Sequence, residues 1–325
     1  MKTKTMIIAM FAALLPITAC GAQTVIQLGD NTMYNYGDAT YDYEDDGPTV
    51  ERNLDLKNFK AIENSYSAKI CYTHGSQYSV KVAGSQKAID VMDFRVEDGT
   101  LYISINKKFK GKRLNIHRGV TLYISSPELE SVSNRGSLSL EGDSWKLNKL
   151  SVSNRGSLNI NINTLDCQSL NIDNSGSFQY ATGGKVKADN VDIFNHGSSS
   201  INLAFSVKDA FKISNSGSSK LEGKVKASSY SESCHGSATD KMDIESDKMD
   251  LNVYGYADFN STFKGKTASI SGYGAGTINM TVDCDKISAE ASGVTKITLK
   301  GTATDTSFYS RSQAKVDASG LTKKM

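Results

Sequence analysis

A short motif recurs along the middle of the chain at a spacing of about twenty residues. Its central glycine occurs at positions that are 20, 20, 21, 20 and 19 residues apart. These glycines are Gly136, Gly156, Gly176, Gly197, Gly217 and Gly236. A repeat of this period is typical of a solenoid, because a single unit cannot bury its apolar face and must stack on its neighbours. The repeat therefore constrains the fold more than any other feature of the sequence.

Within one repeat, apolar and polar residues alternate on both sides of the glycine. Leu150–Ser153 and Ser157–Ile162 show this alternation, which is the period of a β-strand with one buried face. The repeats are rich in serine and asparagine, which are poor residues for helix interiors, and they contain no proline. We therefore predict an all-β fold, a right-handed parallel β-helix (solenoid) with coils of about 20 residues. Each coil is expected to contain a strand, a tight corner, a second strand and a looser corner.

The tight corner is expected to form a structural ladder along the solenoid. Neighbouring coils lie about 4.8 Å apart, so equivalent residues are stacked directly above one another. Asparagine amides can then bond from coil to coil, and glycine and asparagine are the residues that most readily adopt positive φ at a turn. The predicted ladder consists of Asn134, Gly136, Asn154, Gly156, Asn174, Gly176, Asn195, Gly197, Asn215 and Gly217.

The first fifty residues have a different character. Residues 1–19 are predicted to be a lipoprotein signal peptide, with a basic start and an apolar segment too short to span a bilayer. Ile17–Cys20 resembles a lipobox, which predicts that Cys20 is lipidated; cleavage after Ala22 is the alternative. Both outcomes predict export, and a lipid on Cys20 would attach the protein to the outer membrane, with the mature chain on the periplasmic side or the cell surface. Residues 20–50, rich in tyrosine and acidic residues, are predicted to be a flexible tether.

Residues 51–325 are predicted to form a single β-helix domain. Residues 51–130 are expected to be irregular opening coils, and residues 131–320 regular coils. A basic segment, Lys107–Arg118, is interpreted as a solvated excursion from the opening coils. The net charge of +2 argues against a nucleic-acid partner and gives no general attraction to an acidic membrane.

Several of these features together resemble a known family. They are the lipoprotein signal, the Phe59–Ile62 strand, the Gly-Thr-Leu-Tyr-Ile strand at Gly99–Ile103, and the repeated Ser-Asn-x-Gly-Ser corners. The chain resembles the auto-transporter adhesin head domain family, also called the head GIN domain, which is common in Bacteroidetes. The resemblance covers about residues 55–320. It implies a right-handed parallel β-helix on an exported lipoprotein with an adhesin role, and it supplies no catalytic residues. Members usually carry Ser-Gly-Ser-Gly at the corner, so the Asn-Arg-Gly and Asn-Ser-Gly corners put any shared ligand in doubt.

The sequence gives no signature of a cofactor or a metal site. His196 and His235 share a corner phase but are two coils apart, whereas zinc needs three or four converging ligands. We therefore expect no metal and no cofactor. The remaining cysteines are separated by several coils, too far for most disulfides, and are expected to be mainly free, packed thiols. These are Cys71, Cys167, Cys234 and Cys284.

Two functions remain open from the sequence. The first is a non-catalytic, adhesin-like binding or scaffold lipoprotein of the cell envelope, with a glycan or a protein as its ligand. The corner residues that could contact this ligand are Arg135, Arg155, Tyr254, Tyr256 and Tyr273, with His196 and His235 in the same phase. The alternative is a polysaccharide lyase or hydrolase of the β-helix type. Its candidate acids are Asp173, Asp189 and Asp192, but no carboxylate pair at glycosidase separation can be identified.

Overall fold

The structure is a computed structural model that describes residues 40–41, 48–114 and 119–324. The predicted signal peptide, Cys20 and most of the predicted tether lie outside the described residues. Within the described chain, no helix is both long and apolar enough to cross a membrane.

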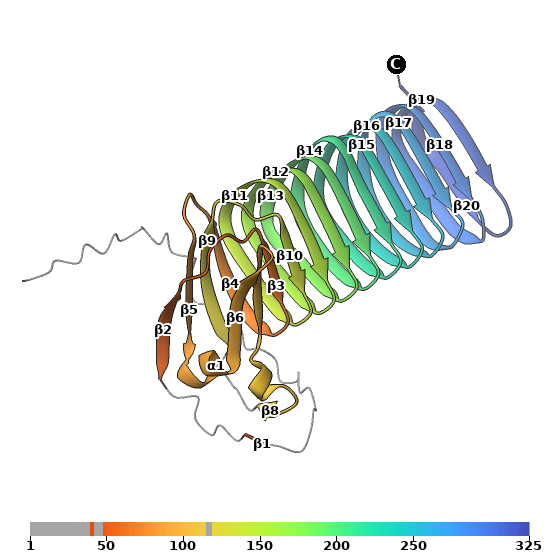
Figure 1. Cartoon of the computed structure of the whole chain (residues 1–325). Helices are drawn as coiled ribbons and strands as arrows, with labels where there is room; N and C mark the ends of the chain where they lie inside the picture. Colours follow the sequence, from red (N-terminus) through yellow and green to blue (C-terminus); the bar gives the residue numbers. More distant parts are fainter. Residues whose placement is uncertain (1–39, 42–47, 115–118, 325) are drawn as a thin grey trace, which may run out of the picture. The chain divides into compact units, whose positions relative to one another are not determined.

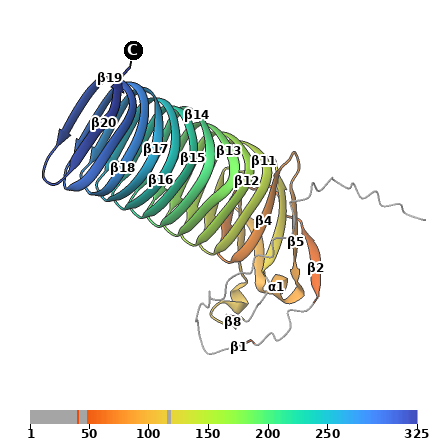
Figure 2. The same cartoon turned by 180° about the vertical axis from the view of Figure 1, so that it is seen from behind.

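Most of the described chain forms one column of stacked, parallel β-coils (Figures 1 and 2). Nine long strands each run once round the column, from one tight corner to the next, and each pairs in parallel with the strands before and after it. They are β11 (Ser137–Asn154), β12 (Ser157–Asn174), β13 (Ser177–Asn195), β14 (Ser198–Asn215), β15 (Ser218–Cys234), β16 (Ser237–Val253), β17 (Tyr256–Gly272), β18 (Ala275–Ala291) and β19 (Val294–Ser310). The last strand, β20 (Lys315–Lys323), covers part of β19. The predicted parallel β-solenoid is confirmed.

Each coil has three paired faces, one more than the two predicted from the alternation. Besides the interruption at the tight corner, the pairing between β11 and β12 is interrupted at Asp143 and again at Asn148. The burial pattern changes phase at the same places, because two successive residues point outward where the chain bends. The predicted looser corner therefore contains a short third face, which in β12 is Thr164–Cys167 with Leu165 and Cys167 directed inward.

The interior of the column is filled by rows of stacked apolar side chains. One row runs through Val132, Val152, Ile172, Ile193 and Ile213, which are paired in register from coil to coil and buried. Because every coil contributes to the same rows, each unit buries its apolar face only against its neighbours, as the repeat requires.

The opening region contains antiparallel pairs that the prediction of opening coils did not include. It contains two stacked layers. The first layer consists of β3 (Ala61–Asn64) followed by β4 (Ser67–His74), and the second consists of β7 (Thr100–Ile105) followed by β9 (Val120–Ser126). The layers pair in parallel, β3 with β7 and β4 with β9. The first layer pairs with β10 (Ser131–Asn134) and β11, so it belongs to the column. Antiparallel partners then cover the outer layer: β5 (Ser79–Ser85) pairs with both β9 and β2 (Thr49–Leu54), and β6 (Met92–Glu97) pairs with β7.

This end of the column is closed by short local elements. The β6–β7 hairpin turns at Asp98 and Gly99, both at positive φ, as a two-residue hairpin requires. Helix α1 (Gln86–Val91) begins at Ser85, whose hydroxyl accepts a hydrogen bond from Ala88 N, and it buries three residues against the first layers. The 3-10 turn η1 (Lys107–Phe109) and strand β8 (Arg113–Leu114) follow β7, and β8 pairs with β1 (Thr40–Tyr41).

Candidate functional site

The tight corner of each coil is organised by a continuous column of asparagine side chains. The amide nitrogen of each asparagine donates to the amide oxygen of the asparagine in the next coil, at 2.7–2.9 Å. The same nitrogen also lies within hydrogen-bond distance of a carbonyl at its own corner, as from Asn174 to Gly176 O at 3.1 Å. The members are Asn64, Asn134, Asn154, Asn174, Asn195 and Asn215, all buried. The structure thus places the five predicted asparagines in one ladder.

The ladder begins earlier than the sequence reasoning proposed and ends at a cysteine. Asn64 is its first member, although Tyr66 stands where later coils have glycine. The spacing Asn64-x-x-Ser67, which matches Asn134-x-x-Ser137, is the signal that could have found it. At the other end the Asn215 amide donates to Cys234 Sγ at 3.7 Å. Apolar or small residues occupy the position in the next three coils, namely Val253, Gly272 and Ala291.

The corner glycines are required for a different reason from the one predicted. Gly136, Gly156, Gly176, Gly197 and Gly217 do not have positive φ. Instead, a Cβ atom at each would lie 2.0–2.1 Å from a backbone carbonyl oxygen of the preceding coil. Stacked corners approach so closely that only glycine fits, so the constraint is steric and acts between coils.

The residue directly after each ladder position forms a corner row along one edge of the column, and its members are exposed except for Tyr273 and Ser292, which are half-buried. The backbone N–H of each member donates to the ladder residue of the preceding coil, as from Tyr254 to Cys234 O at 2.7 Å. In order along the column, the row reads Arg135, Arg155, Ser175, His196, Ser216, His235, Tyr254, Tyr273, Ser292 and Arg311.

Three consecutive members of the corner row stack their rings. His235 and Tyr254 have ring centroids 4.7 Å apart with an interplanar angle of 17°, and Tyr254 and Tyr273 are 5.4 Å apart at 23°. The Tyr273 hydroxyl donates to Glu290 Oε2 at 3.0 Å, and Arg311 Nη2 lies 3.7 Å from Glu290 Oε1. The stack is therefore held in place at one end by a polar contact and an ion pair.

Exposed side chains also occupy a second row of the corner, two residues after the corner row. Tyr254 is 49% exposed and Tyr256 is 53% exposed. Exposed aromatic side chains also occur at Phe194, Phe308 and Tyr309, but these three do not belong to the ring stack. Val294, which lies two coils beyond Tyr256 in the same vertical row, is 57% exposed. We call His235, Tyr254, Tyr256, Tyr273 and Val294 the aromatic patch. Val294 was missed by the sequence reasoning, although it occupies the same repeat phase as Tyr256.

The two arginines that were predicted to contact a ligand lie away from this patch. Arg155 is five coils from Tyr254 along the corner row, which corresponds to about 24 Å at the usual strand spacing. Arg135 is one coil further and forms an ion pair with Glu63. The structure therefore brings the three predicted tyrosines together and leaves both arginines outside the patch.

The interior of the column contains a pair of acids that the sequence reasoning missed. Glu232 occupies an apolar row between Ile213 and Leu251, and Asp240 occupies another between Leu221 and Phe259. Each is only 2% exposed. The two carboxyls interact across the corner, yet neither Asp240 oxygen has a well-aligned hydrogen bond to a described residue.

Burial controls the chemistry of this acid pair. The Tyr230 hydroxyl donates to Glu232 Oε2 at 2.5 Å. Burial raises the pKa of Glu232, and burial together with the charge of Glu232 raises the pKa of Asp240 well above its ordinary value. The pair thus favours protonated carboxyls and is enclosed in the column, out of reach of a large substrate.

The other candidate residues do not converge. Among the described residues, no group of three histidine, cysteine or acidic side chains is placed to hold a metal ion. Asp173 is paired in register with Phe194, and Asp192 with Asn171 and Lys212, so the register stacks neither acid on another acid. None of the four described cysteines forms a disulfide, and burial raises the pKa of Cys167 to about 12.

Comparison with known proteins identifies the family. The profile of the family described as "Putative auto-transporter adhesin, head GIN domain" matches residues 58–228 and 247–325. A search of the curated proteins gives no match.

Solved structures with a similar arrangement include a "putative adhesin" of Bacteroides fragilis, at 19% identity over 83% of this chain and 96% of that chain, with a TM-score of 0.35. A "putative adhesin" of Parabacteroides merdae has 13% identity over 86% and 97%, with a TM-score of 0.41. A "putative lipid binding protein" of Parabacteroides distasonis has 16% identity over 86% and 98%, with a TM-score of 0.40. Because the family profile spans most of its length, the chain belongs to the auto-transporter adhesin head GIN domain family.

Proposed function

We propose that this protein is a non-catalytic, adhesin-like binding module of the cell envelope, and that the aromatic patch holds its ligand. The observation that carries the proposal is the exposure of Tyr254, Tyr256 and Val294 beside the ring stack on one edge of the column. Tyrosine and arginine dominate the energetics of protein interfaces, and here Arg311 adjoins the stack through Glu290. The adhesin description of the family agrees with such a role.

The orientation of the rings favours a protein ligand over a glycan. A sugar ring stacks on the open face of an aromatic ring, but His235 covers one face of Tyr254 and Tyr273 covers the other. The stack therefore presents ring edges and polar tips, beside the exposed side chains of Tyr256 and Val294. Side chains that combine an apolar body with a polar tip suit the partly polar surface of a protein.

The enzymatic alternative has no comparable support. The acids at Asp173 and Asp192 do not stack in register, and Glu232 and Asp240 are enclosed in the interior. A glycosidase needs two carboxyl groups that flank an accessible bond.

Removing two exposed tyrosines tests the binding role. The Tyr254→Ser, Tyr256→Ser double variant is expected to bind cells at least 10-fold more weakly than the wild type, because each side chain has the character of an interface hot spot. The assay is titration of a labelled full chain carrying Cys20→Ser on a panel of intact bacterial and animal cells. Protease treatment of the cells should abolish binding, whereas periodate oxidation of their glycans should not.

Arg155→Ser provides the matched control, since Arg155 is exposed at the same corner position but lies outside the aromatic patch. It should leave binding unchanged. Equal binding by the double variant and the wild type, with identical circular dichroism, would contradict the proposal. Loss of binding after periodate alone would assign the patch to a glycan.

We also propose that the protein is exported and attached to the outer membrane by a lipid on Cys20. The lipobox-like Ile17–Cys20 segment after a short apolar stretch supports this. Radioactive palmitate supplied to producing cells is expected to label the full chain, and Cys20→Ser should abolish the label. An unlabelled wild type would favour ordinary cleavage after Ala22, and persistent labelling of the variant would contradict lipidation at Cys20.

A further inference from the structure

A basic loop at the closed end of the column carries an unusual local charge. Between Gly99 and Pro127 the chain has six lysine and arginine residues and no aspartate or glutamate. Since the whole chain has a net charge of +2, the remainder must carry −4. Four of these cations fall within the six residues Lys107–Lys112. The near-neutral total therefore conceals one strongly positive segment.

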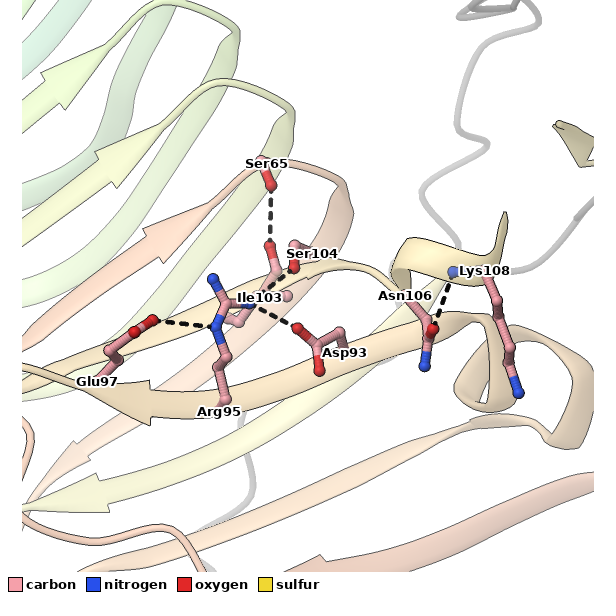
Figure 3. A network of polar contacts seen from close by, with 8 residues as sticks. All are labelled: Ser65, Asp93, Arg95, Glu97, Ile103, Ser104, Asn106 and Lys108. Atoms are coloured by element: carbon pink, nitrogen blue, oxygen red, sulfur yellow. Dashed lines mark hydrogen bonds and ion pairs between the residues drawn. The ribbon is translucent and has the colours of Figure 1, made fainter. Parts of the chain in front are cut away.

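Hydrogen bonds and a packed aromatic ring order the backbone of this loop. Asn106 Oδ1 accepts a hydrogen bond from Lys108 N at 3.2 Å, and Lys110 N donates to Lys107 O at 3.2 Å. Phe109 packs against the apolar core, and the ammonium groups of Lys108 and Lys112 lie 5.2 and 5.8 Å from its ring centroid. Figure 3 shows Asn106 capping the turn, with the Lys108 side chain extending away from the network around Arg95.

Three of the four lysines of the loop are exposed and have no acidic ion-pair partner among the described residues. They are Lys107, Lys108 and Lys110. By contrast, Arg95 in the adjacent hairpin contacts Asp93 at 2.6 Å and Glu97 at 3.4 Å. Asp90 is the acid whose charge interacts with Lys108, and it is already held by Gln86 and Arg52.

We propose that residues Lys107–Lys112, the basic loop, dock on an anionic lipid surface. Charge complementarity selects such a surface, because several clustered lysines each add about 1 kcal/mol of attraction to anionic headgroups. The path of the chain agrees, since β8 directly after the loop pairs with Thr40–Tyr41, only twenty residues from Cys20. A chain of that length spans at most about 70 Å. Docking would place the closed end of the column on the membrane.

Docking through the basic loop would fix how the column is oriented relative to the membrane. The aromatic patch begins at His235, directly after β15, and Figure 1 shows β15 well along the column from the closed end that carries the basic loop. A column held by its closed end would present this patch away from the lipid surface, where a ligand on another surface can reach it. The docking itself depends neither on the proposed ligand nor on lipidation of Cys20.

Vesicle binding by the full chain tests the inference. With Cys20→Ser in every protein, the measured quantity is the affinity for phosphatidylcholine vesicles containing about one third phosphatidylglycerol, divided by the affinity for pure phosphatidylcholine vesicles. The wild type should prefer the anionic vesicles, and 0.5 M salt should remove the preference. The Lys107→Gln, Lys108→Gln, Lys110→Gln variant should lower this ratio about 100-fold, because each lysine contributes about five-fold to the affinity for anionic vesicles.

A second triple variant matches the change of charge elsewhere. Lys146→Gln, Lys208→Gln and Lys212→Gln alter exposed lysines of the column that form no ion pair with a described residue. This control should change the ratio less than two-fold. The inference is overturned if both variants lose the preference equally, if the wild type shows no preference, or if soluble dextran sulfate binds the loop as tightly as the vesicles do.

Discussion

Gly176→Ala is expected to destabilise the protein by about 3 kcal/mol or more in urea denaturation followed by circular dichroism. The new Cβ atom would lie 2.1 Å from Gly156 O and 2.7 Å from the carbonyl carbon of Arg155. Both are backbone atoms of the preceding coil, and Gly156 O already accepts a hydrogen bond from Ser177 N at 2.9 Å. To relieve the clash, two coils would have to move apart, although each is also paired with the coil on its other side. The destabilisation would therefore extend beyond one side chain.

Two controls separate this clash from other effects of alanine. Ser175→Ala, at the adjacent exposed corner position, should change stability by less than about 0.5 kcal/mol. Gly111→Ala, at φ +80° with no atom within 4 Å of the new Cβ, should cost about 1–2 kcal/mol from backbone conformation alone. At an ordinary φ without a clash, glycine to alanine stabilises by about 0.4–1 kcal/mol. A neutral or stabilising Gly176→Ala would therefore refute the steric explanation.

The regular coils could be predicted because their spacing also sets their register. A period of twenty residues places Asn134, Asn154 and Asn174 above one another, and the structure pairs these three positions directly. The outward direction of Tyr254 and Tyr273 follows from the same phase. The stacking of their rings does not, because it depends on side-chain rotamers that the repeat leaves open.

The opening region could not be predicted in the same way. Alternation of apolar and polar residues is the same in parallel and antiparallel strands, so β5 and β6 could not be distinguished from further coils. The third face of each coil was hidden for a related reason. It is only about four residues long and contributes two inward side chains, too few to establish a period.

The buried acids were predictable in principle. Glu232 stands four residues before Gly236, as Ile213 stands four before Gly217. Asp240 stands four residues after Gly236, as Leu221 stands four after Gly217. The phase of the repeat therefore directs both inward, and only the expectation that acids face solvent concealed them.

Replacing this buried network with apolar residues is expected to stabilise the protein by about 2–4 kcal/mol at pH 7. The variant is Tyr230→Phe, Glu232→Leu, Asp240→Val. It removes the two carboxyls and the hydroxyl that would otherwise lose its partner, and valine limits the added volume beside Leu221 and Phe259. The measurement is urea denaturation of wild type and variant over a range of pH.

The gain should increase with pH. In the unfolded chain both carboxyls titrate near pH 4. In the folded chain burial holds the pKa of Glu232 above its ordinary value and that of Asp240 well above it, so from about pH 4 upward the folded protein keeps protons that the unfolded chain has lost. Wild-type stability therefore falls as pH rises through this window, by up to about 1.4 kcal/mol per pH unit for each proton retained.

Comparison at each pH isolates this effect from the rest of the molecule. Surface acids such as Glu130 and Asp283, whose pKa values are lowered by bonds to lysines, act with the opposite sign but are present in both proteins. The variant should thus exceed the wild type least near pH 4 and most above pH 7. Glu232→Gln with Asp240→Asn should abolish the difference in slope without giving the full gain, because polar groups stay buried. If the difference in free energy of unfolding between wild type and the apolar variant is constant from pH 4 to pH 8, these carboxyls do not retain protons in the folded protein.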